Sequence, residues 1–262
     1  MEEVVPCYDT EITGCRVADV SGWGWNLALT KGVDAGRRRF STSLSTDDVY
    51  FPDDAEDPSH GAATKEYGHS QRKVLSADWP VQWEDAPVFI TDNSFTVSVW
   101  VHVGAVDRTM AVVSARGDRQ SVFSLGARPS IVDGVAGTRF EMTTRNHDRA
   151  AGVSENRVIA PAVLAPQSEG VWTHLVAVYD ETAGQVRLYV DGEPAGEAEQ
   201  APLWRASGPL LVGSAWSTLD DGVAQIVDQW VGGIDELYLF QGAMTATEVM
   251  RLHRSQAEPA CC

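Results

Sequence analysis

Hydrophobic and polar positions alternate along two neighbouring stretches in the second half of the chain. One side of the first stretch carries Trp172, His174, Val176 and Val178. The second stretch repeats the two-residue period at Val186, Leu188 and Val190. Turn-forming residues at 180–184 separate the two stretches, and Asp191 and Gly192 turn the chain again. A two-residue period interrupted by such turns predicts an antiparallel β-hairpin with one buried face.

The stretch 94–103 alternates in the same way and predicts a strand with one fully apolar side. That side is formed by Phe95, Val97, Val99, Val101 and Val103. Further short strands, bounded by clusters of Gly, Pro, Asp and Asn, are predicted at 110–115, 122–125, 139–144, 158–160, 210–213 and 234–240. So many short strands in one chain predict an all-β fold built as a sandwich of antiparallel sheets.

Helix signals are scarce until the C-terminal region. Thr245 and Glu248 have the spacing of a capping box, in which each side chain binds the backbone N–H of the other residue. The apolar residues Val249, Met250 and Leu252 follow and suffice for about two turns. We therefore expect one short helix to close the fold.

The charge of the chain narrows its range of partners. Among 262 residues, 20 basic and 37 acidic ones give a formal net charge of −17. This charge repels a phosphate backbone or an anionic membrane surface, so a nucleic-acid partner is not expected. No apolar run is long enough to span a bilayer, and the first residues lack the basic start and apolar core of a secretory signal. Membrane insertion is therefore not expected either.

The four cysteines are confined to the two ends of the chain, at Cys7, Cys15, Cys261 and Cys262. Four cysteines allow three pairings, and the sequence does not choose between disulfides and free thiols. A zinc site is disfavoured because neither a C-x-x-C spacing nor a paired-histidine motif is present.

Several segments together carry a family resemblance. The hairpin WTHLVAVYDETAGQVRLYVDG is similar to the W-x-H-x-x-x-x-Y-D…G-x-x-x-L-Y-V-D-G signature of laminin-G-like jellyroll domains, within the concanavalin A-like lectin/glucanase superfamily. VADVSGWGWNLALTKGV resembles the opening segment of that family, and WVGGIDELYLFQGAMTATEV resembles its closing strand and helix. The resemblance is to the type found in bacterial extracellular proteins. It implies a two-sheet antiparallel jellyroll sandwich and an extracellular or cell-surface location.

The resemblance also implies a single domain at 17–254, preceded by a lead-in at 1–16 and followed by a tail at 255–262. The chain departs from the family by a polar, acidic insertion at about 38–72. A connection of this length is usually either functional or disordered, and its shortage of apolar residues favours a disordered or loosely packed flap. Tyr50 and Phe51 are the residues that could attach it to the body.

A structural calcium ion is expected from the same resemblance, because the family's opening turn lies beside its penultimate strand. The candidate ligands are Asp19, Asn26 and Asp235. Calcium needs six to eight oxygen ligands, and the Gly-rich turn at 21–24 offers backbone carbonyls. The alternative is structural, with an Asx-turn at Asp19 and a strand-end hydrogen bond at Asp235.

The segment 216–230, taken as a loop, holds the candidate ligand-binding residues. Three aspartates lie between two tryptophans, an arrangement suited to stacking on a sugar and binding its hydroxyl groups. The candidates, with Trp204 added from the preceding segment, are Trp204, Trp216, Asp220, Asp221, Asp228 and Trp230. The alternative for each tryptophan is a place in the core of the sandwich.

No catalytic pattern accompanies these residues. His174 lies within a strand and has no Ser, Cys or Asp at a recognisable partner spacing. The E-x-D-x-(x)-E pattern of the glucanase branch is absent, and Asp235 and Glu236 are adjacent, so their side chains leave on opposite faces of a strand. Catalysis is therefore not expected.

Three functions remain after these arguments. The leading hypothesis is a non-catalytic module that binds a carbohydrate or a glycosylated extracellular protein, within a larger protein or assembly, with calcium bracing its opening turn. The second is a spacer or assembly module without a small ligand. The third is a divergent glycoside hydrolase. A fold does not by itself decide between them.

Overall fold

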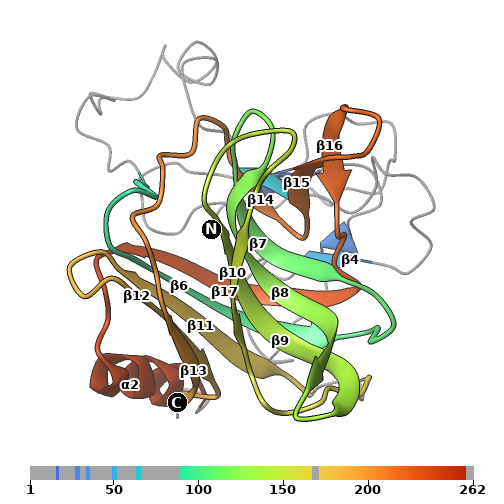
Figure 1. Cartoon of the computed structure of the whole chain (residues 1–262). Helices are drawn as coiled ribbons and strands as arrows, with labels where there is room; N and C mark the ends of the chain where they lie inside the picture. The colour runs from blue at the N-terminus through green and yellow to red at the C-terminus, as the bar shows by residue number, and fades with distance from the viewer. Residues whose placement is uncertain are drawn as a thin grey trace, which may run out of the picture.

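Two antiparallel sheets pack face to face in the computed structural model, which describes residues 89–166 and 171–257 together with the backbone of five short strands before residue 66 (Figure 1). Sheet A has the order β1 (Arg16–Val17), β2 (Leu27–Leu29), β5 (Ala63–Lys65), β14 (Leu210–Val212), β7 (Met110–Arg116), β8 (Ser121–Val132), β9 (Val135–Arg145) and β10 (Glu155–Ile159). Sheet B has the order β13 (Glu193–Glu199), β12 (Gln185–Val190), β11 (Thr173–Asp180), β6 (Phe95–Val103), β17 (Gly232–Gln241), β4 (Val49–Phe51) and β3 (Asp34–Ala35). A separate hairpin joins β15 (Ala215–Thr218) to β16 (Ala224–Val227).

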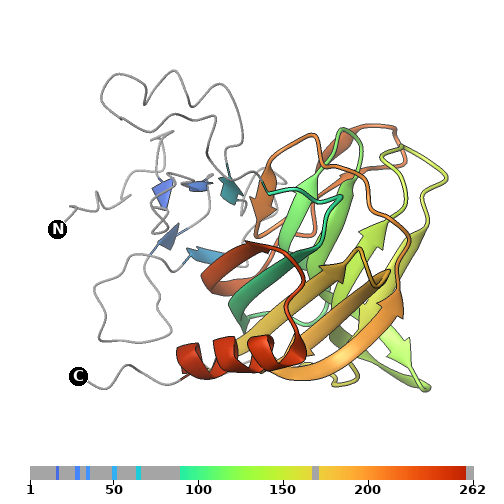
Figure 2. The ribbon, with the colours of Figure 1, turned by 90° about the vertical axis from the view of Figure 1, so that its left-hand side faces the viewer.

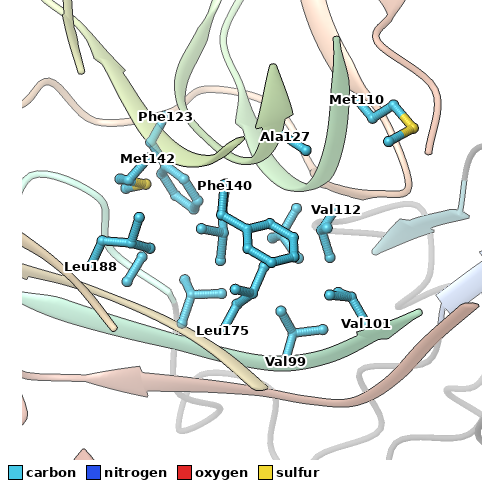
Figure 3. Packing of buried hydrophobic residues seen from close by; sticks show 14 of the residues in the cluster. Val99, Val101, Met110, Val112, Phe123, Ala127, Phe140, Met142, Leu175 and Leu188 are labelled. Atoms are coloured by element: carbon cyan, nitrogen blue, oxygen red, sulfur yellow. The ribbon is translucent and has the colours of Figure 1, made fainter. Parts of the chain in front are cut away.

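The hydrophobic core lies between the two sheets, and the two-residue period of the strands determines which side chains reach it. Figure 3 shows Val99, Val101 and Leu175 of sheet B facing side chains of sheet A. The opposing residues are Met110, Val112, Phe123, Ala127, Phe140 and Met142, all of them nearly or fully buried. The predicted all-β sandwich with alternating strands is therefore confirmed.

The hairpin formed by β11 and β12 was expected to bury one face, but both of its faces are covered. Leu175 and Tyr179 point into the core, whereas Val176 and Val178 on the opposite face pack against Val249 of the C-terminal helix. The helix, α2 (Ala246–Ala257), lies along this outer face of sheet B (Figure 2). The sequence did not reveal the second burial because the helix that provides it comes much later in the chain.

The capping box at the start of α2 is confirmed. Glu248 Oε2 accepts a hydrogen bond from Thr245 N (2.7 Å), and Thr245 Oγ1 accepts one from Glu248 N (3.3 Å). The helix is longer than the two turns expected from its apolar residues, with 12 residues. Its additional length is fixed by packing, since His253 stacks on Trp100 with 5.4 Å between ring centroids.

No strand was predicted for the segments that form β4, β5, β13, β15 and β16. β13 has few β-branched or aromatic residues, and β15 and β16 occupy the segment that was taken as a loop. Within the expected insertion, β4 pairs with β17 and β5 pairs with β14. The description of the insertion as a loose flap is therefore wrong for these two strands, whose backbones belong to the sheets. The four cysteines lie outside the described residues.

Replacing a core residue of β11 tests this packing directly. Leu175 is fully buried, so Leu175→Ala should lower the free energy of unfolding by about 2–5 kcal/mol, through lost burial and the cavity left behind. Glu197→Ala changes an exposed residue of β13 and should stay within about 0.5 kcal/mol of the unchanged protein. Urea unfolding followed by circular dichroism measures both. Equal effects of the two substitutions would contradict the assignment of Leu175 to the core.

Candidate ligand-binding face

The outer face of β8, β9 and β10 is polar because each strand alternates. On β9, Phe140 and Met142 point into the core, so Glu141 and Arg145 point away from it. The neighbouring strands place further charged side chains on the same face. We call the resulting group the ion-pair ladder; its members are Arg128, Glu141, Arg145, Glu155 and Arg157.

In the ladder each carboxylate is held by two guanidinium groups. Arg128 lies between both carboxylates, with its Nε 3.1 Å from Glu141 Oε1 and its Nη1 donating to Glu155 Oε2 at 3.0 Å. Arg145 Nη2 donates to Glu155 Oε1 at 2.9 Å. Arg157 Nε donates to Glu141 Oε2 at 3.0 Å. The ladder therefore fixes donors and acceptors across three strands of one sheet.

Burial and charge act against each other in the ladder. The side chains of Glu141 and Arg145 are only 6% and 7% exposed. Burial would raise the pKa of Glu155, but the guanidinium groups of Arg145 and Arg128 outweigh it and hold that pKa below its usual value. The ion pairs thus keep Glu155 ionised.

Asp228 follows β16 and lies beside the ladder. Its backbone adopts a φ of 57°, and its carbonyl oxygen accepts a hydrogen bond from Ala111 N at 2.7 Å. Burial raises the pKa of its carboxyl, although the charges of Arg128 and Arg145 act in the opposite direction. Within residues 89–166 and 171–257, no group donates a hydrogen bond to this carboxylate. Asp228 therefore presents a half-buried acceptor that has no donor among these residues.

A rigid turn borders the ladder at 117–120. The carboxylate of Asp148 accepts three backbone hydrogen bonds from this turn, at 2.6 Å from Asp118 N, 2.7 Å from Arg119 N and 2.8 Å from Gln120 N. A carboxylate that receives three N–H groups fixes the backbone of the turn. We call this turn, together with the hairpin β15–β16, the hairpin rim (Figure 1).

Trp216 connects the hairpin rim to the ladder. Its Nε1 donates to Asp118 O at 3.2 Å, and Arg116 Cζ lies 3.6 Å from its ring centroid. Its backbone N–H donates to Ser121 Oγ at 2.9 Å, and Ser121 O accepts from Arg145 Nη1 at 3.3 Å. The partly exposed Trp216 side chain is therefore held at the border of the polar face.

The other tryptophan candidates differ in their positions. Trp204 is partly buried against the core, its Nε1 donates to Arg145 O at 3.0 Å, and a Cβ at Gly117 would lie 2.5 Å from its ring. The Trp204 ring therefore packs against Gly117 in the turn of the hairpin rim. Trp230 is 1% exposed and belongs to the core cluster, so its ring is not accessible to a ligand. For Trp230 the core assignment that the sequence left open is the one observed.

The three aspartate candidates also lie in different places. Asp220 and Asp221 are exposed in the turn of the hairpin, where Asp221 Oδ1 accepts from Val223 N at 2.9 Å. Asp228, at the other end of β16, is the aspartate that lies beside the ladder. The ladder itself was not predicted from the sequence. The alternation of charged and apolar residues in RFEMTTR, within β9, is the signal that could have indicated it.

The expected calcium ligands are only partly described. Asp235 is 8% exposed, and its Oδ1 accepts from Glu236 N at 2.7 Å, at an irregularity in the pairing of β17 with β6. Asp19 and Asn26 lie outside the described residues. Among the residues that the structure does describe, no group of three His, Cys, Asp or Glu side chains could hold a metal ion. The described residues thus supply one carboxylate of the expected site.

His174 has a structural environment. It is fully buried, its Nε2 lies 2.8 Å from Ser98 Oγ, and its ring stacks on Trp100 with 4.9 Å between centroids. His174 is therefore a structural residue, and its ring also stacks on His253 of α2. No helix in the described part of the chain is long and apolar enough to cross a bilayer.

Comparison with protein families gives a match over residues 76–250 to a laminin G-type model of the concanavalin A-like lectin/glucanases superfamily. The chain belongs to this superfamily. The match contains the ladder, the hairpin rim and α2 up to residue 250, and it leaves out the segment 17–33 that also carried the resemblance.

Individual relatives are distant. Pentraxin-related protein PTX3 of Bos taurus is 30% identical over 103 residues, which span 37% of this chain and 23% of that protein. The binding domain of Paraclostridial Mosquitocidal Protein 1 has a TM-score of 0.57 at 14% identity. The match covers 91% of this chain and 49% of the mosquitocidal chain. Domain 4 of the extracellular arabinanase AbnA from Geobacillus stearothermophilus was solved in complex with arabinotriose and has a TM-score of 0.51 at 17% identity. The match covers 90% of this chain and 92% of the AbnA domain chain. At these identities the structures establish the fold alone.

Asp228→Asn tests the environment assigned to Asp228. A carboxyl whose pKa is higher in the folded than in the unfolded state destabilises the fold when it ionises; this destabilisation is absent below the unfolded pKa and complete above the folded pKa. The variant should therefore melt at a higher temperature than the unchanged protein at pH 7, and the difference should disappear in acid. Asn also suits the positive φ of this position.

The matched control is Asp133→Asn, because Asp133 has a similar φ of 50° in an exposed turn between β8 and β9. Its melting temperature should not change. A lower melting temperature for Asp228→Asn at pH 7 would contradict the proposed burial of an ionised carboxylate.

Proposed function

We propose that this protein is a non-catalytic module that binds carbohydrate, alone or on a glycosylated protein surface. The observation that carries the proposal is the polar face of β8–β10, where the ladder holds charged donors and acceptors in fixed positions beside Trp216. Membership of a superfamily that includes lectins supports it. The arabinotriose bound to domain 4 of AbnA supports it as well, since that domain has the same fold.

The chemistry of the face suits a sugar. Each sugar hydroxyl both donates and accepts, so neighbouring guanidinium and carboxylate groups match it better than a surface of one charge. The apolar side of a pyranose or furanose ring stacks on an aromatic face. Trp216 at the border is partly exposed, although the guanidinium of Arg116 lies over one side of its ring. Because both the ladder and the hairpin rim are braced by hydrogen bonds, little ordering is required when a ligand binds.

We further propose that the module acts outside the cell, as one part of a longer protein or assembly. The chain spans less than a quarter of the curated relative that it matches and about half of the mosquitocidal binding-domain structure. A net charge of −17 makes an anionic membrane or a nucleic acid a poor partner.

A glycan array probed with the unchanged protein and with Trp216→Ala tests the proposed function. The unchanged protein should bind a defined set of oligosaccharides, and the substitution should weaken binding about tenfold or more, as is typical when an aromatic side chain that contacts the ligand is removed. Tyr238→Ala is the control, since Tyr238 is 38% exposed on β17 of the other sheet.

Retention of full binding by Trp216→Ala would contradict the placement of the ligand at the hairpin rim. An array on which nothing binds would favour a spacer or assembly module. Release of reducing sugar from any bound polysaccharide would favour the divergent glycoside hydrolase.

We also propose a structural calcium ion at Asp235, with Asp19 and Asn26 as its other side-chain ligands. The buried carboxylate of Asp235 supports this, because among the described residues only its Oδ1 is engaged, by the backbone N–H of Glu236. If the folded state alone binds calcium, the ion stabilises it by about 2.7 kcal/mol at a hundred times the Kd. Millimolar calcium should therefore raise the melting temperature, a chelator should reverse the rise, and Asp235→Asn should abolish it. An unchanged melting curve would mean that Asp235 only caps the strand irregularity.

A further inference from the structure

The ladder and Asp228 together form a group without net charge. Arg139 lies on the same side of β9 but is 2% exposed, and its guanidinium donates to backbone oxygens of Val135, Gly137, Ser130 and Pro161. Three guanidinium groups are matched by three carboxylates in this group: Arg128, Arg145, Arg157, Glu141, Glu155 and Asp228. The positive groups are already committed, since each arginine is paired with Glu141, Glu155 or both. An incoming carboxylate or sulfate would have to displace one of these paired carboxylates, which would leave a largely buried negative charge without its partner.

Asp228 differs from the other two carboxylates. Glu141 and Glu155 each accept hydrogen bonds from guanidinium groups, whereas the carboxylate of Asp228 receives none from any residue in 89–166 or 171–257. Its position is nevertheless fixed, because its carbonyl oxygen is bonded to Ala111 N on β7. The lack of a donor among the described residues therefore does not result from a loose loop.

We infer that this face selects an uncharged glycan and that Asp228 is the residue that accepts hydrogen bonds from its hydroxyl groups. The inference rests on the proposed function and adds the ligand class and the specificity-determining residue. A carboxylate with both oxygens available can accept from two neighbouring hydroxyls of one sugar ring, and charge-assisted bonds of this kind are stronger than neutral ones. The guanidinium groups of Arg128 and Arg145 already donate to Glu155. Their remaining N–H groups can donate to ligand hydroxyls and orient the ligand, which does not have to be anionic.

A role of Asp228 in binding can be distinguished from a role in folding stability. The charged groups near enough to affect its pKa are Arg128 on β8, Glu141 and Arg145 on β9 and Glu155 on β10. Desolvation outweighs the attraction of the two arginines, so the ionised carboxylate opposes folding. A carboxylate that opposes local stability, in a group where the other charges are paired, fits a binding role. Its substitution should thus weaken binding without weakening the fold.

The test compares the unchanged protein with Asp228→Asn, Asp228→Gly and the control Asp133→Asn. Both replacements at Asp228 suit its positive φ; the first removes only the charge and the second removes the side chain. All four proteins are applied to an array carrying neutral oligosaccharides, uronic-acid oligosaccharides and sialylated oligosaccharides. The best neutral binder is then titrated by calorimetry at pH 7 and in mildly acidic buffer, and each melting temperature is recorded.

We expect neutral oligosaccharides to bind and acidic ones to be rejected. Both variants at Asp228 should lose at least tenfold in affinity with an unchanged or higher melting temperature, while Asp133→Asn stays within twofold. Affinity of the unchanged protein should fall as acid protonates Asp228, and that pH dependence should be absent in Asp228→Asn.

Preferred binding of an acidic glycan, or unchanged affinity in both Asp228 variants, would overturn this inference and leave the proposed function intact. Failure of the unchanged protein to bind any carbohydrate would overturn both.

Discussion

The two-residue alternation of β9 is the constraint on which the rest of the structure depends. The strand places Phe140 and Met142 between the sheets and Glu141 and Arg145 on the opposite side, so one backbone positions both the core and the polar face. A shift of one residue in its pairing with β8 would exchange the two sets and expose the core residues. Burial of the apolar side therefore fixes the register, and the register fixes the ladder. Packing of the core therefore also makes the candidate site rigid.

Once the ladder is in place, electrostatics determines what its members do. Charges as buried as Glu141 and Arg145 are tolerated only when they are paired and hydrogen-bonded, and both are. The hairpin rim is attached to this network through Ser121, which bonds both Trp216 and Arg145. An aromatic side chain and a charged face that are far apart in the sequence are thereby joined into one surface by a single hydroxyl and its backbone.

Local patterns predicted the fold well where the partners of a strand are close in sequence. The period of Phe95 to Val103, the turn at Asp191 and Gly192, and the capping box at Thr245 all correspond to observed elements. The site was less accessible to prediction. Trp230 and Trp216 look alike in the sequence, and only the three-dimensional packing separates a core ring from a border ring. The ladder was missed because its pairs join three strands, and no single segment shows more than two of its members on one face.

Asp228 gains its significance from this context. In isolation it is one of three aspartates in a polar segment, and its sequence neighbours do not distinguish it from Asp220 or Asp221. The turn after β16 carries it to the ladder, where desolvation raises its pKa and the arginines are occupied by Glu141 and Glu155. A purely structural face would gain stability by replacing it with Asn, which suits the same backbone and carries no charge. Under the proposed function, a ligand would supply to this carboxylate the hydrogen-bond donors which the described residues do not.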